Sequence, residues 1–235
     1  MVDLSAETAE LWARLGRNDL GRGRVLMLVG AHDGAGVSTV ARELALTVAR
    51  RGSQSVWLVD LDVLAEVSQI GSIALDPARY GDPGAAAAAS PDGSSFLTVR
   101  PGHLAQDSQA VLGDADYVSA HQIGTHQWWT TRFRVELLQP GQSVHILPGA
   151  SYWDAVRRHV DLVVVDAPAL DRSQAALTLA PYMDAIVLVV GADDPDVRGQ
   201  GVMRDALAAA GGEIAGVFLN RIEVETPGFI QALSP

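Results

Sequence analysis

The residues best suited to chemistry lie in a glycine-rich stretch at positions 30–39, Gly-Ala-His-Asp-Gly-Ala-Gly-Val-Ser-Thr. Gly34 and Gly36 allow successive backbone amides to turn toward one anion, and the helix expected to follow adds the positive end of its dipole. Such a loop binds phosphate. In the usual pattern a lysine neutralises the terminal phosphates, and the hydroxyl that follows it holds magnesium. Here Val37 takes the place of the lysine, whereas Ser38 keeps the hydroxyl.

No other lysine can replace the missing one, because all 17 basic residues of the chain are arginine. A hydrogen bond to a charged group is worth about 1.5–3 kcal/mol, so nucleotide affinity is expected to fall roughly 10- to 100-fold and to remain measurable. Catalysis should suffer more, since phosphoryl transfer depends on cations placed at the phosphates. His32 and an arginine from a neighbouring subunit stay open as substitutes.

Polar side chains also stand where other apolar runs end, namely Asp60 and Asp62, Asp166, and Asn220. Parallel strands bring their carboxyl ends to one edge of a sheet, so we expect these groups to face the loop. Ser38 and the carboxylates would hold a hydrated magnesium ion, and the Asn220 amide would read the edge of an adenine.

The elements that must position these groups alternate between short apolar runs and helical periodicity. This alternation predicts an α/β fold, a mostly parallel sheet with helices on both faces. The expected strands are 25–29, 55–62, 143–147, 160–166, 184–190 and 214–221. The expected helices are 3–16, 40–51, 152–159 and one that begins at Asp194 as N-cap, with Pro195 in its first position.

We expect one domain over residues 1–235, long enough for a sizeable core. Three segments have their own character: a helical segment within 1–20, a divergent region at 63–141 that reads as mostly helix and loop, and a low-complexity, exposed and mobile loop at 81–95 within it. Trp128, Trp129, His121 and His126 are interpreted as part of a packed loop over the sheet rather than as a metal site.

Composition excludes several classes of function. The net charge of −11 opposes binding to nucleic acid or to anionic lipid. The chain has no cysteine, which excludes disulfides and thiolate chemistry and suits a reducing compartment. Its apolar runs are too short to cross a bilayer, and the N-terminus lacks a signal-peptide pattern. We therefore expect a cytoplasmic protein without direct membrane insertion.

The motifs together resemble those of the deviant Walker ATPases of the MinD and ParA type. Within that group they are most similar to the cytoplasmic kinase domain of bacterial tyrosine kinases that partner polysaccharide co-polymerases. The likeness is carried by residues 33–39, 58–62, 144–149, 163–168 and 216–221. It extends over 24–62 and 143–222, so it leaves 63–141 unexplained.

This resemblance implies a P-loop nucleoside triphosphatase fold that binds ATP or ADP with magnesium. It implies catalytic roles for Asp60 and Asp62 in an active protein, and magnesium ligation by Ser38, Asp60 and Asp166. The implied nucleotide-binding residues are Gly34, Ala35, Gly36, Val37, Ser38, Thr39, Asn220 and Arg221.

Departures from the family pattern shape the functional hypothesis. Besides the degenerate loop, residues 223–235 contain no tyrosine, although these kinases typically phosphorylate a C-terminal tyrosine cluster. The N-terminal self-association motif keeps Arg14 and Arg17 but has Leu11 in place of its glutamate, so a homo-oligomer stays open. We interpret the chain as a catalytically impaired, kinase-like protein that regulates or scaffolds envelope polysaccharide synthesis or export. Its expected partner is a membrane co-polymerase of the chain-length determinant type, which would hold it at the inner membrane.

Two alternatives stay open. One is an active ATPase or protein tyrosine autokinase with a relocated cation. The other is a positioning ATPase of the ParA or MinD type, whose additional early lysine falls here near His32 or Asp33. The acidic charge of the chain and the absence of basic residues at 226–233 oppose this second alternative.

Overall fold

The computed structural model describes residues 3–16, 21–52, 54–101, 112–194 and 196–221. The helices are α1 Ser5–Arg14, α2 Val37–Arg50, α3 Gln69–Ala74, α4 Pro77–Tyr80, α5 Ser151–Arg157, α6 Ala175–Leu179 and α7 Val197–Ala209. The strands are β1 Arg24–Val29, β2 Val56–Asp60, β3 Pro83–Ala88, β4 Leu97–Arg100, β5 Val118–Ile123, β6 Trp128–Phe133, β7 Ser143–Ile146, β8 Leu162–Asp166, β9 Ala185–Gly191 and β10 Ile214–Asn220. Single 3-10 turns lie at Asp114–Tyr117, Val135–Leu137 and Ala180–Tyr182.

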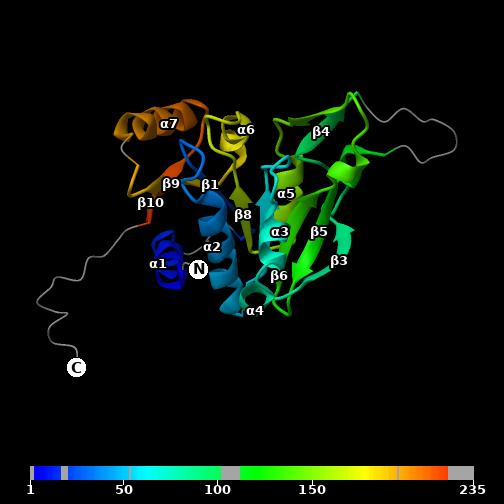
Figure 1. The fold of residues 1–235 in the computed structure, drawn as a ribbon, viewed down its shortest axis with the longest axis horizontal. Helices are drawn as coiled ribbons and strands as arrows, with labels where there is room; N and C mark the ends of the chain where they lie inside the picture. The colour runs from blue at the N-terminus through cyan, green and yellow to red at the C-terminus, as the bar shows by residue number, and fades with distance from the viewer. Residues whose placement is uncertain (1–2, 17–20, 53, 102–111, 195, 222–235) are drawn as a thin grey trace, which may run out of the picture.

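Eight of these strands form one sheet in the order β10-β9-β1-β8-β2-β6-β5-β3 (Figure 1). The strands from β10 to β6 pair in parallel, and β5 and β3 then add on in antiparallel fashion. The predicted fold class, a mostly parallel sheet in an α/β protein, is confirmed. The carboxyl ends of β1, β2 and β8 meet at one edge, which is where the loop after β1 begins.

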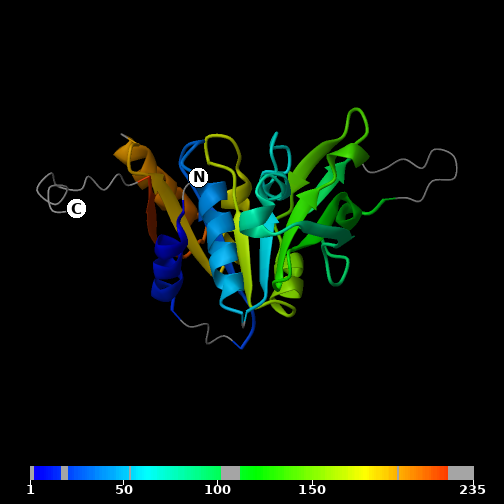
Figure 2. The same cartoon turned by 60° about the horizontal axis from the view of Figure 1, so that its bottom comes forward.

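Helices cover both faces of the sheet, and β1 shows why. Leu26 and Leu28 face the cluster that holds α1 and α2, whereas Val25, Met27 and Val29 face the cluster that holds α5, α6 and α7. A strand buried on both faces must be apolar at every position, which is how β1 reads. Figures 1 and 2 show α1 and α2 side by side across one face.

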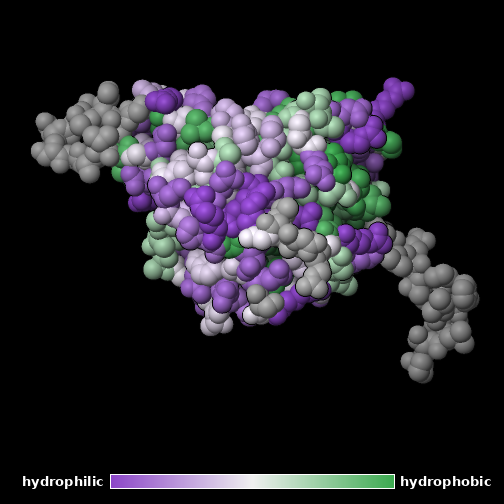
Figure 3. All heavy atoms as spheres, turned by 180° about the vertical axis from the view of Figure 1, so that it is seen from behind, coloured by the Kyte–Doolittle hydropathy of each residue, from purple (hydrophilic) through white to green (hydrophobic). Residues whose placement is uncertain are grey.

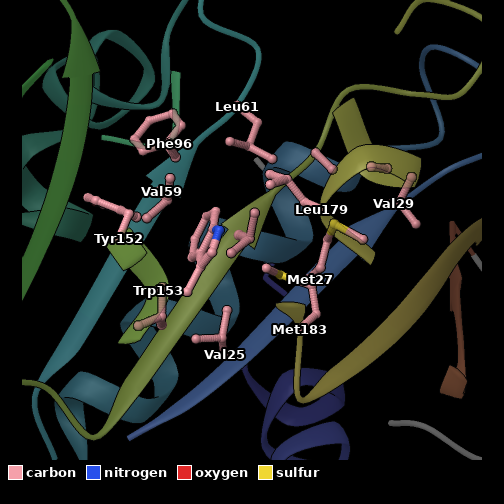
Figure 4. Packing of buried hydrophobic residues seen from close by; sticks show 14 of the residues in the cluster. Val25, Met27, Val29, Val59, Leu61, Phe96, Tyr152, Trp153, Leu179 and Met183 are labelled. Atoms are coloured by element: carbon pink, nitrogen blue, oxygen red, sulfur yellow. The ribbon is translucent and has the colours of Figure 1, made fainter. Parts of the chain in front are cut away.

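The opposite face is anchored by aromatic rings from α5. Phe96, which precedes β4, packs on Tyr152 with ring centroids 4.9 Å apart and on Trp153 at 6.0 Å. Figure 4 shows Trp153 lying among the apolar side chains of the neighbouring strands. Trp153 is fully buried, so this cluster holds the small β4–β7 sheet against the main one.

The region 63–141 departs most from the sequence-based expectation of helix and loop. It contributes β3, β5 and β6 to the main sheet and β4 to a two-stranded sheet with β7. The predicted loop at 81–95 contains β3, which forms the edge of the sheet and pairs with β5. Five consecutive alanines carry no period, so main-chain pairing with β5 rather than side-chain pattern makes this segment a strand. The prediction that this segment is exposed is confirmed for β3, which is exposed along most of its length.

The aromatic segment around Trp128 is a hairpin in the sheet and not a loop over it. Gly124 turns the chain between β5 and β6 with a φ of 55°. Trp128 is fully buried and meets the ring of Tyr80 edge-on at 6.2 Å. Burial along β6 does not alternate strictly, because Thr130 and Thr131 are both buried, so the residue pattern carried no clear strand signal here. Pairing with β2 on one side and β5 on the other makes this segment a strand.

Helix positions agree with expectation apart from one cap. The helix after β9 begins at Val197, where Asp196 caps it by accepting from the Gly199 amide over 2.9 Å. The predicted N-cap, Asp194, instead accepts from the amide of Asp196 and from Gln200. Pro195, Arg17 and the tail 222–235, on which other expectations rested, lie outside the described residues.

Within the described part of the chain, no helix has the length and apolar character that crossing a bilayer requires. Figure 3 shows hydrophilic side chains gathered near the middle of the rear face. Apolar side chains stay exposed at the β10 edge, where Val217 and Leu219 are more than half exposed.

Candidate phosphate-binding site

The loop between β1 and α2 is shaped by Gly36, the N-cap of α2. Its φ is 87°, a left-handed conformation that favours glycine. A Cβ at this position would lie 2.2 Å from Nδ2 of Asn220, so space requires glycine as well. Because glycine has no capping side chain, the first amides of the 14-residue helix α2 are left for an outside acceptor. The junction is therefore built to meet an anion.

Asn220, at the end of β10, braces this loop from below. Its Nδ2 donates to the carbonyl oxygen of Ala35 over 3.0 Å, and its Oδ1 accepts from the Arg221 amide. The side chain is buried, and these two hydrogen bonds engage both ends of its amide. Arg221 donates to the Gly34 carbonyl and pairs with Asp193 at 3.1 Å. The structure thus places both predicted nucleotide-side residues against the loop.

Asp60 and Asp166 are paired directly in register at the ends of β2 and β8. Both are buried, with exposed fractions of 6% and 2%. Burial, reinforced by the neighbouring Asp166, raises the pKa of Asp60 to about 8. Burial also raises the pKa of Asp166 to about 6, against hydrogen bonds from Gln69 and Ser38. Two buried carboxylates so placed favour a positive charge between them.

Gln69, the first residue of α3, supplies hydrogen-bond donors at this place, and sequence reasoning missed it. Its Nε2 donates to Asp166 Oδ2 at 2.6 Å and to the Ser38 carbonyl at 2.8 Å. Its backbone amide donates to Asp60 Oδ2 at 2.8 Å, and its Oε1 accepts from Arg42 at 2.8 Å. The only sequence signal was Ser68, whose hydroxyl caps the short helix.

Oxygen acceptors from three elements therefore converge here: Ser38 on α2, Asp60 on β2 and Asp166 on β8. Magnesium prefers oxygen ligands and keeps several waters, so a hydroxyl and two carboxylates fit it. The buried side-chain amide of Gln69 donates to Asp166, and its backbone amide donates to Asp60, so both carboxylates that such a cation would engage are hydrogen-bonded to this residue. No group of three or more His, Cys, Asp or Glu side chains in the described ranges is arranged to hold a metal by itself.

Val37 is mostly buried beneath α2, although it also lies among the residues that line the pocket above the loop. Its side chain is 8% exposed and belongs to the apolar cluster beneath α2. Its Cγ2 packs so closely on the backbone of Gly30 that a Cβ there would lie 3.1 Å away. The valine in the lysine position therefore packs in the hydrophobic core. The loop itself contributes no permanent positive charge.

A pocket of about 160 Å³ opens above the loop, lined by residues 32–39 together with Asp62, Asp166 and Arg172. Arg172 comes from the turn after β8, and sequence reasoning did not single it out. It pairs with Asp62 at 2.8 Å and with Asp33 at 3.3 Å. Thr39 and Ala35, both predicted loop residues, are among those that line the pocket.

His32 bridges the loop to two neighbouring turns. Its Nε2 lies 3.0 Å from Asp196 Oδ2, and its Nδ1 lies 3.6 Å from Asp171. The hydrogen bond with Asp196, with the nearby charges of Asp194 and Asp171, raises the pKa of His32 above its ordinary value. The rim is rich in carboxylates, so a free anion is repelled there unless a metal accompanies it.

No family model and no curated protein sequence matches the chain. The sheet order and the loop before α2 define the class of fold, an α/β protein with a mostly parallel sheet, which is similar to solved structures of a tyrosine kinase domain and of Cyanothece McdA.

Solved structures give particular likenesses. The chimerical protein CapA2B2 is 16% identical, with a TM-score of 0.61 over 95% of this chain and 87% of its own. The kinase domain of the Escherichia coli tyrosine kinase ETK is 14% identical, with a TM-score of 0.60 over 94% of this chain and 78% of its own. Cobyrinic acid a,c-diamide synthase from Mycobacterium smegmatis, with bound ADP and magnesium, is 13% identical, with a TM-score of 0.54 over 90% and 79%. At these identities the likeness defines the fold alone.

Proposed function

We propose that this chain is a kinase-like P-loop protein that binds magnesium-nucleotide weakly and is impaired in phosphoryl transfer. In this proposal it regulates or scaffolds envelope polysaccharide synthesis or export, together with a membrane co-polymerase. The polysaccharide role rests on the sequence resemblance, and the fold likeness to tyrosine kinase domains is consistent with it.

The observation that carries the proposal is the contrast between Val37 and its surroundings. Val37 lies in the core, whereas Ser38, Asp60 and Asp166 still converge beside the open amides of α2. The amides would hold phosphate oxygens, and Ser38 with Asp166 would hold the metal. Magnesium, when bound, would supply charge neutralisation at the phosphates. Binding is thereby retained, while the loop cation that phosphoryl transfer uses is absent.

The burial of the tyrosines supports the proposal that the chain is impaired in phosphoryl transfer. The sequence has four, at positions 80, 117, 152 and 182. Tyr80, Tyr117 and Tyr152 are buried, with exposed fractions of 7%, 1% and 2%, and Tyr182 is half-buried. None of them is freely presented for phosphorylation by a second copy of the chain.

The rival function is an active ATPase or autokinase with a relocated cation. It is favoured by one observation, the guanidinium of Arg172 in the pocket above the loop. Under this alternative the chain turns over ATP or labels a tyrosine of another protein, and turnover should be lost in Asp60→Asn.

Calorimetric titration with magnesium-ATP and magnesium-ADP tests the proposal, with Asp166→Asn as the control. We expect saturable binding with a Kd of roughly 0.1–1 mM that the control loses, since a missing charged contact costs about 10- to 100-fold. Phosphate release and phosphotransfer should stay at background. Absence of binding at millimolar nucleotide would remove the nucleotide role, and turnover sensitive to Asp60→Asn would favour the active rival.

The proposed role in polysaccharide synthesis or export needs a separate test. Deleting the gene from its own bacterium should change the amount or chain length of surface polysaccharide, and the wild-type gene should restore it. Unchanged polysaccharide in the deletion strain would contradict this part of the proposal. Restoration by the Asp166→Asn allele would show that the role does not need nucleotide.

A further inference from the structure

Arg172 stands where a phosphate ligand of the proposed site needs a positive charge. The residue follows β8, and its amide closes a turn by donating to the Ala169 carbonyl over 3.0 Å. That turn aims the side chain across the pocket, so that the guanidinium lies against Asp33 of the loop and Asp62 after β2. Among the described residues that line this pocket, Arg172 is the one with a permanent positive charge.

The other arginines near the loop are committed elsewhere. Arg42 donates to Gln69 and lies over the ring of Tyr80 at 5.4 Å, beneath the site. Arg221 is held on the far side of the loop by Gly34 and Asp193. Neither faces the pocket that Ser38 and Asp166 line.

The weaker of the two ion pairs of Arg172, with Asp33, is easily exchanged. The side chain of Arg172 is 42% exposed and that of Asp33 is 70% exposed, so solvent screens their attraction. Asp62, at 2.8 Å and 23% exposed, is the closer partner. A guanidinium presents two parallel N–H groups that match phosphate oxygens, and it stays charged at every working pH. Exchange of the carboxylates for a phosphate would keep the guanidinium paired and would release Asp62 into the site.

We propose that Arg172 is the phosphate-binding cation of this site and takes over the binding role of the missing loop lysine, though not its role in phosphoryl transfer, by contacting the terminal phosphates of a nucleoside triphosphate. The inference rests on the proposed nucleotide-binding function. It assigns that function a residue from the β8–α6 turn rather than from the loop.

Calorimetry on the full chain tests the assignment with magnesium-ATP and with magnesium tripolyphosphate, which carries phosphates but no base. Arg172→Ala should weaken both about 10- to 100-fold. Arg158→Ala is the matched control, because Arg158 is an exposed arginine paired with Asp92 far from the loop, and it should bind as the wild type does. Circular dichroism checks folding, and Arg172→Gln replaces Arg172→Ala if the alanine variant does not fold.

Val37→Lys supplies the decisive cross-check, since it returns the lysine to the loop. In that background Arg172→Ala should cost much less affinity than it does in the wild type. Wild-type affinity retained in Arg172→Ala would overturn the inference while leaving the proposed function intact. Absence of binding by the wild-type chain would overturn both, and an equal loss with and without Val37→Lys would overturn the assignment of Arg172 to the lysine's role.

Discussion

The amide of Gln69 donates to the carboxylate of Asp166 over 2.6 Å, although 97 residues separate them in the chain. This contact ties α3 to the end of β8 and satisfies a buried carboxylate oxygen of Asp166. The side-chain and backbone amides of Gln69 donate to the carboxylates that a cation would bind. We therefore expect the contribution of Gln69 to stability to depend on whether a cation occupies the site.

Gln69→Ala should therefore lower the free energy of unfolding by about 1–3 kcal/mol, because it leaves buried polar partners unsatisfied. Magnesium should restore part of the loss by binding the same acceptors. Urea unfolding with and without magnesium measures both effects. Gln142→Ala, at a surface turn, is the control and should change stability by less than about 0.5 kcal/mol. A loss that magnesium does not reduce would contradict the link.

Glu43 on α2 forms a buried anchor for α4. It accepts from Arg79 Nη2 at 2.5 Å and from the Tyr80 hydroxyl at 2.5 Å, and its side chain is 1% exposed. Glu43→Ala should destabilise the protein by about 3 kcal/mol, because Arg79 loses its buried partner. Glu136→Ala breaks an exposed pair with Arg132 and should cost no more than about 1 kcal/mol. Similar losses of unfolding free energy in the two variants, measured by chemical unfolding, would show that the buried contacts of Glu43 stabilise the protein no more than an exposed ion pair does.

Glycine is required at position 36 both by the backbone conformation and by the lack of space for a side chain. Gly141 allows the contribution of conformation to be measured alone. Both have a φ of 87°, but a Cβ at Gly141 meets nothing within 4 Å. Gly141→Ala should cost about 1–2 kcal/mol from backbone strain alone. Gly36→Ala should cost more and should weaken nucleotide binding, because it collides with Asn220.

Adding Asn220→Ala to Gly36→Ala should recover part of the lost stability, since the colliding amide is then gone. Differential scanning calorimetry of the single and double variants measures this coupling. Purely additive losses would mean that the collision is relieved in another way.

His32 should make stability depend on pH. The hydrogen bond with Asp196 and the charges of Asp194 and Asp171 hold the pKa of His32 above its unfolded value near 6.5. The stabilisation is therefore fully present below about pH 6.5 and is lost as the pH rises through the folded pKa. His32→Gln should destabilise the protein more at about pH 6 than at about pH 8.

An NMR titration of the His32 ring reports its pKa directly. Asp196→Asn should lower that pKa by removing the largest cause of the shift. A pKa at or below 6.5 in the unaltered protein would refute the prediction.

Much of the fold was predictable because its parallel strands are buried on both faces. An apolar run must end where a strand leaves the core, so Asp60 and Asp166 marked strand ends in the sequence. The helix after the loop was also predictable, because Val40, Leu44 and Val48 recur at helical spacing and lie on one buried face. The region 63–141 gave no such pattern, because β3 is an exposed run of alanines whose pairing depends on β5.

The amino-acid sequence by itself determined a glycine-rich loop without lysine between a strand and a helix, the strand ends that carry carboxylates, and the α/β class. These follow from local pattern, since residue type and spacing decide which segments are buried and where they stop. Only the tertiary structure decided that Gln69 satisfies the buried carboxylates and that Arg172 faces the loop from the other side. Both contacts join residues distant in sequence, and only the packing of α3 and of the β8–α6 turn brings their side chains to one place.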